Sequence, residues 1–257
     1  MKIASFNANS IRARIHVIIR WIEKERPDVL CLQETKAKDS DFPLKAIEST
    51  GYDVVYKGEK SYNGVATLSR LPFEGVSYGF DGDGNDEGTR LIVTQVKGIP
   101  VVNTYIPQGT DPSSDRFQYK LKWFDRLLQF FDKNYTKNNP LLWLGDINVA
   151  PMEIDVHDPV RLLGRVGFHP DEHRALQRVK DWGFVDVFRK HKEGAGEYTF
   201  WDYRVRDAVK RGIGWRVDHI LATKPLADRS VDAWIDVEPR LWEKPSDHTF
   251  LVAEFRE

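Results

Sequence analysis

Short apolar segments that stop abruptly at polar residues recur along this chain. Such segments, bounded by turn residues, are typical of buried β-strands. The ends of neighbouring strands can converge on one edge of a sheet, where α/β proteins bind their ligands. The pattern therefore predicts a sheet-based fold with polar side chains gathered at one sheet edge. The segments are 2–6, 28–33, 101–106, 141–144, 215–222 and 249–255, and the polar residues associated with them are Asn7, Glu34, Tyr105, Asp146, Asn148, Asp218, Asp247 and His248.

Amphipathic helices are predicted between some of these strands. Apolar residues recur at helical spacing in 11–24, with Ser10 as a candidate N-cap. Residues 117–131 have the strongest apolar face, and 173–180 form a third predicted helix. Further strands are predicted at 52–56, 65–69, 90–96, 198–203 and 230–237.

The order of these elements favours one domain. A chain of 257 residues can bury a core without disulfides. It contains no short repeat and no Gly/Ser-rich linker. Strands that mix alternating and continuous apolar runs, with helices between some of them, suit sheets packed together and covered by helices. We therefore expect residues 1–257 to form a single α/β domain.

Composition excludes several classes of protein. No apolar stretch approaches the roughly 20 residues of a membrane helix, and the N-terminal apolar run is too interrupted for a signal peptide. The single cysteine, Cys31, allows no disulfide within the chain, which fits a cytoplasmic protein. The formal net charge is -1, so any surface that binds nucleic acid must be a local one.

The acidic and amide residues at the strand ends suit metal-assisted hydrolysis. Glu34, Asp247 and Asn7 offer hard oxygen ligands of the kind that Mg²⁺ prefers. Such an ion would neutralise a phosphate and its leaving oxygen. Asp146 could accept a proton from water. Taken alone, a carboxylate at a strand end is more often a turn or cap residue.

The remaining strand-end residues suit phosphate binding. His248 could contact a phosphate oxygen while a carboxylate fixes its orientation, and Asn148, Tyr105 and Asn7 are potential donors to phosphate. Each also has a simpler interpretation, because Tyr105 could be a core aromatic and Asp247 with His248 a surface pair of little energetic value. Only the joint occurrence of these residues favours a catalytic site.

The order and spacing of these residues resemble the exonuclease III family of AP endonucleases, in the DNase I-like endonuclease/exonuclease/phosphatase superfamily. The resemblance runs from the first predicted strand to the last. No single motif is specific to this family, but the occurrence of all of them in the family's order is specific to it. The motifs are Ser-Phe-Asn-Ala-Asn-Ser-Ile-Arg-Ala at 5–13, Leu-Cys-Leu-Gln-Glu-Thr-Lys at 30–36, Asn-Gly-Val-Ala at 63–66, Asn-Thr-Tyr-Ile-Pro-Gln-Gly at 103–109, Gly-Asp-Ile-Asn-Val-Ala-Pro at 145–151, Tyr-Thr-Phe-Trp-Asp-Tyr-Arg at 198–204, Gly-Trp-Arg-Val-Asp at 214–218 and Lys-Pro-Ser-Asp-His at 244–248.

The resemblance implies a four-layer α/β sandwich with two packed mixed β-sheets flanked by helices. It implies Mg²⁺, with Mn²⁺ accepted, held mainly at Glu34 with Asn7 and Asp247 nearby. The other roles that it implies are handling of the proton of the attacking water or of the leaving group by Asp146, phosphate contacts by Asn148, Tyr105 and His248, and pairing of Asp218 with His248.

Several positions depart from the family pattern, among them Ile147, which replaces a commoner large residue and indicates a change in packing only. Asn9-Ser10 stands where Asn-Gly or Asp-Gly is common, which predicts a stiffer loop after the first strand. Gln108 stands where Asn is frequent. Thr89 is inserted into the usual Glu-Gly-Arg, which leaves the placement of Arg90 open.

Two basic groups are candidate DNA-binding surfaces. Residues 204–216 carry five basic side chains, among them Arg204 and Arg216, and are interleaved with aromatic residues, which favours nucleic-acid binding. Arg116, Lys120 and Lys122 form the second group, for which a solvated helix face is nearly as good an interpretation. The acidic run 81–87 should face solvent, away from DNA.

A damage pocket is implied by the resemblance at Phe200, Trp215 and Val217. A flipped abasic sugar is small and mostly apolar, so a compact apolar pocket could accept it and exclude a normal nucleotide. The alternative is that these three side chains belong to the core, where aromatic residues in strands usually lie.

The sequence thus predicts a Mg²⁺-dependent phosphodiesterase acting in DNA repair. The expected partner is double-stranded DNA with abasic sites or damaged 3′ ends, and the expected form is a monomer. In-line attack by water 5′ to an abasic site would leave a 3′-hydroxyl, and 3′→5′ exonuclease and 3′-phosphatase activity would use the same site. Two rivals remain open: a superfamily enzyme acting on a lipid headgroup, inositol phosphate or RNA, and a DNA-binding module without catalysis.

Overall fold

Two six-stranded β-sheets lie face to face in the computed structural model, which describes residues 1–82 and 87–256. The strands of the first sheet are, in spatial order, β11 (Ser230–Asp236), β12 (Phe250–Phe255), β1 (Lys2–Asn7), β2 (Val29–Gln33), β4 (Val65–Ser69) and β3 (Asp53–Lys57). Those of the second sheet are β5 (Gly75–Tyr78), β6 (Leu91–Val96), β7 (Ile99–Tyr105), β8 (Leu142–Asp146), β10 (Asp218–Thr223) and β9 (Phe184–Asp186).

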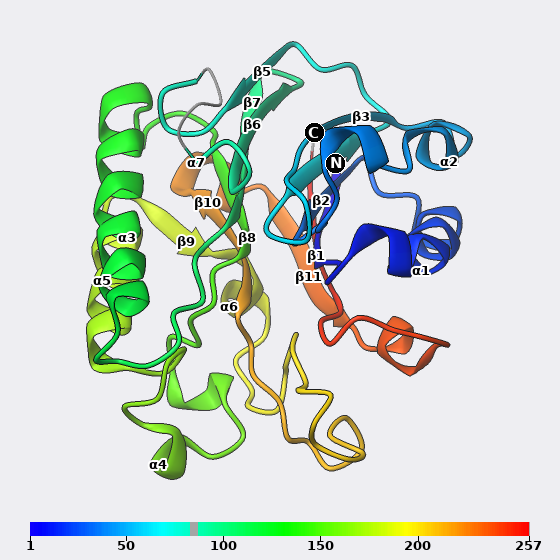
Figure 1. Ribbon diagram of the computed structural model, residues 1–257. Helices are drawn as coiled ribbons and strands as arrows, with labels where there is room; N and C mark the ends of the chain where they lie inside the picture. Colours follow the sequence, from blue (N-terminus) through cyan, green and yellow to red (C-terminus); the bar gives the residue numbers. More distant parts are fainter. Residues whose placement is uncertain (83–86, 257) are drawn as a thin grey trace.

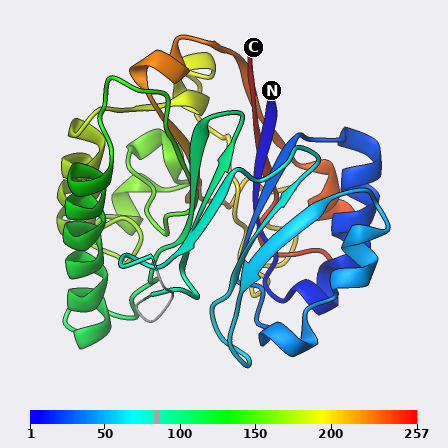
Figure 2. The ribbon, with the colours of Figure 1, turned by 90° about the horizontal axis from the view of Figure 1, so that it is seen from above.

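Helices cover the outer face of each sheet, as Figures 1 and 2 show. The helices beside the first sheet are α1 (Ile11–Glu25) and α2 (Leu44–Glu48). The two along the second sheet are α3 (Asp115–Asn134) and α5 (Pro170–Asp181). The shorter helices are α4 (Pro159–Leu162), α6 (Val187–His191) and α7 (Lys224–Ala227). The four-layer α/β sandwich that the resemblance implied is therefore confirmed.

Three apolar layers hold these elements together. The central layer lies between the sheets and includes Ile3, Val101 and Leu144. A second layer joins α1 to the first sheet, and a third joins α3 and α5 to the second sheet. Burial of apolar surface on this scale is the main force that stabilises such a fold, and it fixes the position of one sheet against the other.

The strand register brings the polar strand ends to one edge. In the first sheet Asn7 of β1 pairs with Gln33 of the parallel strand β2. In the second sheet Asp146 lies opposite both Tyr105 and Asp218. Gly145 allows this close pairing, because its φ is +136° and a Cβ there would stand 1.9 Å from the Thr104 carbonyl oxygen.

Several expectations from the sequence need correction. Residues 198–203 do not form a strand; Phe200 makes only isolated bridges to Trp215 and His248. Ser10 precedes α1 but makes no capping hydrogen bond through its side chain, because its φ of 87° turns it away from the capping geometry. The helix predicted at 117–131 is longer than expected, and the side chain of Ser114 caps its first turn.

Two further expectations concern the surface. In the part of the chain that the structure describes, no helix combines the length and the apolar character needed to span a bilayer. The acidic run 81–87 lies largely outside the described residues. Of its ends, Asp81 is exposed, whereas the Glu87 side chain is only 12% exposed and pairs with Arg126, so that residue does not face solvent as predicted.

Candidate active site

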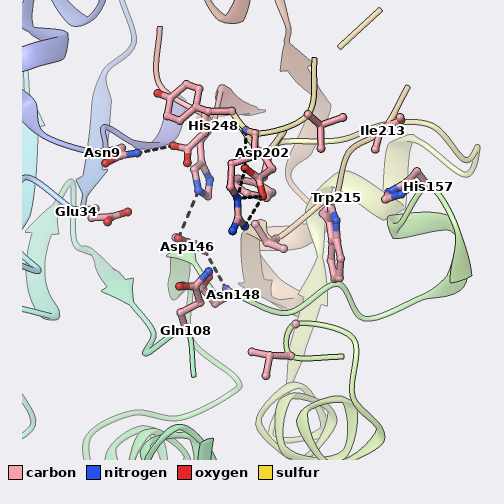
Figure 3. Close-up of a pocket in the computed structure, with 18 of the residues that line it drawn as sticks. Asn9, Glu34, Gln108, Asp146, Asn148, His157, Asp202, Ile213, Trp215 and His248 are labelled. Atoms are coloured by element: carbon pink, nitrogen blue, oxygen red, sulfur yellow. Dashed lines mark hydrogen bonds and ion pairs between the residues drawn. The ribbon is translucent and has the colours of Figure 1, made fainter. Parts of the chain in front are cut away.

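A cavity of about 820 Å³ opens at the edge where the polar strand ends of the two sheets meet. Figure 3 shows that its polar residues come from both sheets and that an apolar wall with Trp215 lies beside them. Pockets of this size with a few converging polar groups are the usual form of a small-molecule or catalytic site. The predicted site residues in its lining are Glu34, Tyr105, Asp146, Asn148, Phe200, Arg204, Trp215, Val217, Asp247 and His248.

Asn7 connects the two halves of the site. Its side chain is completely buried, and its amide nitrogen donates to Glu34 Oε2 at 2.9 Å and to Asp146 Oδ2 at 2.8 Å. Glu34 follows a strand of the first sheet, and Asp146 ends a strand of the second. One amide therefore fixes the distance between carboxylates that are far apart in the sequence.

Glu34 and Asp247 lie in one hydrogen-bonded cluster that sequence reasoning only partly identified. Lys36 Nζ lies 2.8 Å from Glu34 Oε1 and donates to Asn9 Oδ1 at 2.7 Å. The Asn9 amide donates to Asp247 Oδ1 at 2.9 Å. From the sequence we named Asn9 at a departure from the family pattern but not as a site residue, and we did not single out Lys36. The position of Lys36 two residues after Glu34 was the signal that could have identified it.

The chemistry of this cluster suits a hard divalent cation. The carboxylates of Glu34 and Asp247 and the amide oxygen of Asn9 are potential oxygen ligands that line one cavity, and the fully buried Asn7, which donates to Glu34, adds a further amide oxygen beside them. Carboxylate and amide oxygens are ligands that Mg²⁺ accepts. The Glu34 side chain is only 18% exposed, and at present the Lys36 ammonium balances its charge.

A second group of ligand atoms lies deeper in the site. The carboxylates of Asp146 and Asp218 and the imidazole of His248 place ligand atoms within 4.8 Å of one another and could hold a metal ion. Asp218 Oδ2 lies 2.8 Å from His248 Nδ1. Within the described residues, the buried Asp218 Oδ1 has no hydrogen-bond partner. Two positions in the cavity are therefore chemically suited to a cation.

Asp146 and His248 have strongly shifted acidities. Burial raises the pKa of Asp146 to about 7, although the neighbouring His248 opposes this shift. Burial alone would lower the pKa of His248, but the carboxylates of Asp218 and Asp146 outweigh it and raise that pKa to about 10. His248 Nε2 stands 3.9 Å from Asp146 Oδ2. The site thus pairs a cationic imidazole with a carboxyl that titrates near neutral pH, which is typical of functional sites.

Two of the site residues have strained backbones. Glu34 has a φ of 54° and Asn148 a φ of 56°, both in the left-handed region that non-glycine residues seldom adopt. Glu34 directly follows β2 of the first sheet, and Asn148 lies two residues after the end of β8 of the second sheet. Strain of this kind is retained where the surrounding structure enforces it and is concentrated at functional sites.

Asn148 and Tyr105 face the cavity beside Asp146. The Asn148 backbone N–H donates to Asp146 Oδ1 at 2.9 Å, and its side-chain amide donates to the Ile106 carbonyl at 2.9 Å. Burial raises the pKa of the Tyr105 phenol well above its ordinary value, and the nearby carboxylate of Glu34 raises it further. Tyr105 therefore keeps its proton and can act as a hydrogen-bond donor at neutral pH.

The apolar wall consists of Phe200, Trp215 and Val217. Val217 is 6% exposed, and Phe200 and Trp215 are partly buried in the same small cluster. The Phe200 ring lies 5.0 Å from that of His248, which joins the wall to the polar half. Gly167 also borders the cavity; a Cβ there would meet the Trp215 ring at 3.3 Å, so its lack of a side chain leaves room beside the tryptophan.

Arg216, which we predicted to bind substrate, is a structural residue. Its side chain is completely buried, and its guanidinium donates to Asp155 at 2.7 Å and to Asp186 at 2.9 Å. Successive residues of an extended segment point to opposite sides, so Arg216 must point away from the cavity that Trp215 and Val217 line. The prediction for Arg216 is therefore wrong.

Lys120 also differs from the prediction of a basic DNA-binding face. It is buried against the Glu172 carboxylate at 2.5 Å and donates to the carbonyls of Gln108 and Asn148. Glu172 in turn accepts from the Gly167 N–H at 2.7 Å. The pair thus holds together three loops that border the cavity instead of binding a ligand.

The remaining predicted basic residues are available to solvent. Arg116 is exposed at the start of α3. The Arg204 side chain is 90% exposed and pairs with Asp202 at 2.6 Å, and that of Arg206 is 95% exposed. Arg204 borders the cavity, whereas Arg116 is not among the described residues that line it.

Comparison with known proteins shows which proteins the chain is similar to. Residues 4–248 match the endonuclease/exonuclease/phosphatase family. Exodeoxyribonuclease III of Haemophilus influenzae is 37% identical over 268 residues, covering 100% of both chains. A solved AP endonuclease from Archaeoglobus fulgidus has a TM-score of 0.96 and 48% identity over 100% of both chains. A 3′ phosphatase from Neisseria, solved with a product DNA hairpin, has a TM-score of 0.94 and 33% identity, also over 100% of both chains.

Proposed function

Because the chain belongs to the exonuclease III and AP endonuclease family of DNA-repair phosphodiesterases, we propose that it hydrolyses the DNA backbone 5′ to abasic sites. We further propose that the same site removes nucleotides from 3′ ends in double-stranded DNA and removes 3′-phosphates. Relatives named for each type of chemistry, an exodeoxyribonuclease, an AP endonuclease and a 3′ phosphatase, support this combination. Residues 1–257 would act as one domain, as a monomer in the cytoplasm.

Glu34, Asn7 and Asp247 would hold Mg²⁺ or Mn²⁺. When bound, the ion would supply positive charge to the phosphate and to the oxygen that leaves. The Lys36 ammonium, 2.8 Å from Glu34, would then be displaced or would share that carboxylate. The buried Asp146, Asp218 and His248 group would offer a second position for a cation only with His248 deprotonated, because a cationic imidazole has no free lone pair for a metal.

The residues of the polar half have distinct roles in the proposed reaction. Asp146 takes the proton of the attacking water or delivers one to the leaving oxygen, since its raised pKa suits both directions near neutral pH. His248, kept cationic and oriented by Asp218, donates to a phosphate oxygen. Asn148 and Tyr105 donate hydrogen bonds to the same phosphate, which fixes it for in-line attack.

One observation carries the proposal for abasic sites. The polar groups suited to phosphate and the apolar wall of Phe200, Trp215 and Val217 line the same cavity. A phosphodiester bound at the polar half would place the adjoining sugar against this wall. An extrahelical sugar without a base is small and largely apolar, and so it matches the wall in both size and polarity.

Product analysis on matched duplexes tests the proposed function. The substrates are duplexes that carry an abasic site, a recessed 3′ end, a 3′-phosphate or no lesion. In Mg²⁺ we expect incision 5′ to the abasic site with a 3′-hydroxyl product, release of nucleotides from the recessed end, and release of phosphate. Failure to cut the abasic duplex, with cleavage of an inositol phosphate or RNA instead, would favour another superfamily enzyme. Tight binding without turnover in Mg²⁺ would favour a non-catalytic module.

Truncation of the apolar wall should selectively impair recognition of abasic DNA. We expect Phe200→Ala and Trp215→Ala to lower the preference for abasic over intact DNA by about tenfold or more, the range for loss of an apolar contact in a specificity pocket. Removal of a 3′-phosphate should change less, because no extrahelical sugar is needed. The measurement is the kcat/KM ratio for the two substrates of each variant.

The control for this prediction is thermal stability. Phe200 and Trp215 are only partly buried, so each alanine variant should remain folded. Phe188→Ala provides the contrast, because a fully buried phenylalanine should lose about 3–5 kcal/mol of stability. A large fall in melting temperature for the Phe200 or Trp215 variant, with unchanged substrate preference, would assign the wall to the core.

Neutralising the three arginines of the exposed loop 204–211 should weaken DNA binding equally for all DNA sequences. Replacing Arg204, Arg206 and Arg211 by glutamine removes up to three phosphate contacts, so the slope of log K against log salt should fall by about 2–3. The matched control is Arg216→Gln, which should destabilise the fold because it removes the buried arginine partner of Asp186 and one of the two arginine partners of Asp155. A salt slope equal to that of the native protein would mean that the loop faces solvent in the complex.

A further inference from the structure

A layer of buried polar side chains lies between the two sheets, directly behind the active site. Its members, which we call the polar layer, are Ser5 of β1, Gln33 of β2, Thr67 of β4 and Asn103 of β7. All four are completely buried, and none is among the described residues that line the cavity. The proposed reaction uses none of these side chains.

The polar layer stands where the inner faces of the strands change from apolar to catalytic. Alternate residues of a strand share one face. On β7 the inner face runs from Val101, in the central apolar layer, through Asn103 to Tyr105. On β2, Gln33 immediately precedes Glu34. The polar layer therefore adjoins the backbone that carries site residues of both sheets.

Asn103 joins the second sheet to two strands of the first. Its side-chain nitrogen donates to the Leu32 carbonyl at 3.2 Å and to the Ala66 carbonyl at 2.9 Å, and these two residues are register partners in β2 and β4. Its amide oxygen accepts from Gln33 Nε2 at 2.8 Å, and the same nitrogen donates to Ser5 Oγ at 3.2 Å. One side chain of the second sheet is thus bound to the backbone of the first sheet at two points.

These contacts are directional, whereas the apolar layer beside them is not. Hydrophobic contact is roughly proportional to the buried area, so it holds the sheets together without fixing one exactly against the other. A hydrogen bond weakens steeply when its distance or angle changes, and a buried polar group without a partner is costly. Asn7 makes a similar contact between the sheets at the level of the catalytic groups. Asn103 and Asn7 therefore fix the two sheets against each other at successive levels.

We propose that Asn103 is a positioning residue that keeps the catalytic groups of the two sheets at their working distance. Glu34 and Asp247 lie beside strands of the first sheet, whereas Asp146 and Asn148 lie at the end of β8 in the second (Figure 3). A displacement of about 1 Å between groups that act together can lower a rate by about 100-fold. The proposal rests on the proposed function and adds to it a residue that does not touch the substrate.

The test replaces Asn103 by leucine, which is similar in size and has no hydrogen-bonding group. We expect the single-turnover rate of cleavage at an abasic site to fall by about 10- to 100-fold. The affinity for the uncut abasic duplex, measured in chelator, should stay native. The affinity for Mn²⁺, measured by calorimetry, should also stay native, because Glu34, Asn7 and Asp247 all belong to the first sheet or adjoin it.

Asn103→Ser serves in place of the leucine variant if that variant is too unstable to assay. Its hydroxyl ends one atom short of the asparagine amide nitrogen, so it cannot hold the Leu32 and Ala66 carbonyls as Asn103 does. The same loss of rate with native affinities for DNA and Mn²⁺ is expected.

The matched control is Thr223→Val, at the end of β10 opposite the site. Thr223 is also completely buried, and its hydroxyl donates to the Asn139 carbonyl at 2.7 Å and accepts from the Leu141 N–H at 3.0 Å. Each substitution leaves buried groups without a partner, so both variants should melt several degrees below the native protein. Only the Asn103 variant should lose cleavage rate.

A double variant separates positioning from stability. Asn103→Leu with Gln33→Leu removes both partners of one buried hydrogen bond, and replacing both partners by apolar groups of similar shape can be nearly neutral. We expect the melting temperature to recover toward the native value and the rate to stay low. Recovery of the rate together with the melting temperature would overturn the positioning role, because Asn103 would then act through stability alone.

The outcomes separate this role from the proposed function. If the native protein cuts the abasic duplex and Asn103→Leu cuts it as fast as Thr223→Val does, only the positioning role is overturned. Loss of Mn²⁺ affinity along with the rate would also overturn it, because the damage would then lie within the first sheet. If the native protein in Mg²⁺ cuts no duplex that carries a lesion, the proposed function fails and the positioning role fails with it.

Discussion

Replacing Asp146 by asparagine is expected to lower the single-turnover rate of phosphodiester cleavage by about three orders of magnitude, within the range for loss of a general acid or base. The affinity for uncut DNA should change little, because a proton-transfer group acts in the transition state. Asparagine keeps the size of the side chain and can still contact the Asn7 amide. The measurement is the cleavage rate at saturating enzyme, beside a binding titration in chelator.

The acidity of Asp146 supplies a control for this prediction. Its pKa is raised by burial to about 7, so the folded state disfavours the charged form compared with the unfolded chain. A raised carboxyl pKa means that ionisation costs stability above the unfolded pKa, so the neutral amide should not lower the melting temperature at pH 8. Asp132→Asn, at an exposed position of α3, is the matched variant that should change neither quantity. Loss of DNA affinity with an unchanged single-turnover rate would remove Asp146 from proton transfer.

Replacing Glu34 by alanine should abolish metal binding at the cavity mouth and lower turnover by about a thousandfold or more, because several kcal/mol of charge stabilisation is lost. Titration with Mn²⁺ followed by calorimetry reads out the metal site without reference to activity. In the native protein, chelation should remove activity and added Mg²⁺ should restore it.

The matched control for Glu34 is Glu254→Ala, which removes the same charge at the opposite end of the first sheet. Its metal affinity and turnover should equal those of the native protein. If Glu34→Ala keeps native Mn²⁺ affinity, the ion is held by the buried Asp146, Asp218 and His248 group instead. Full activity of the native protein in excess chelator would exclude a metal role altogether.

The strand ends were predictable from the sequence because hydrophobic patterning and motif order point to them together. Eight of the polar positions named from the sequence meet at one edge, because they lie at or beside the ends of β1, β2, β7, β8, β10 and β12. What patterning cannot supply is the direction of each side chain across an interface between sheets. The pairing of Asn7 with both Glu34 and Asp146 depends on how the two sheets dock, which no local pattern encodes.

The sequence contained evidence against both of the wrong predictions about basic residues. Lys120 lies between Phe117 and Phe124 at helical spacing, so it belongs to the apolar face of α3 and is buried with it. Arg216 stands between Trp215 and Val217, and alternation in an extended segment directs it to the opposite side. Long charged side chains were assigned to the surface by residue type, whereas periodicity correctly assigns both to the interior.

The short elements were not predictable in the same way. Helices α2, α4, α6 and α7 have five residues or fewer, too few for an apolar period to show. Residues 198–203 have the aromatic content of a strand, but Phe200 makes bridges with two different segments and no continuous ladder forms. Tertiary contacts therefore determine the structure of these parts of the chain.

The Asn7 amide, shared between Glu34 of one sheet and Asp146 of the other, has a consequence for how the protein is made. Each sheet alone holds only part of the site. Asp247 and His248 immediately precede β12, which must insert between β11 and β1 before they reach the cavity. A growing chain therefore carries no complete active site until this late strand has docked between β11 and β1.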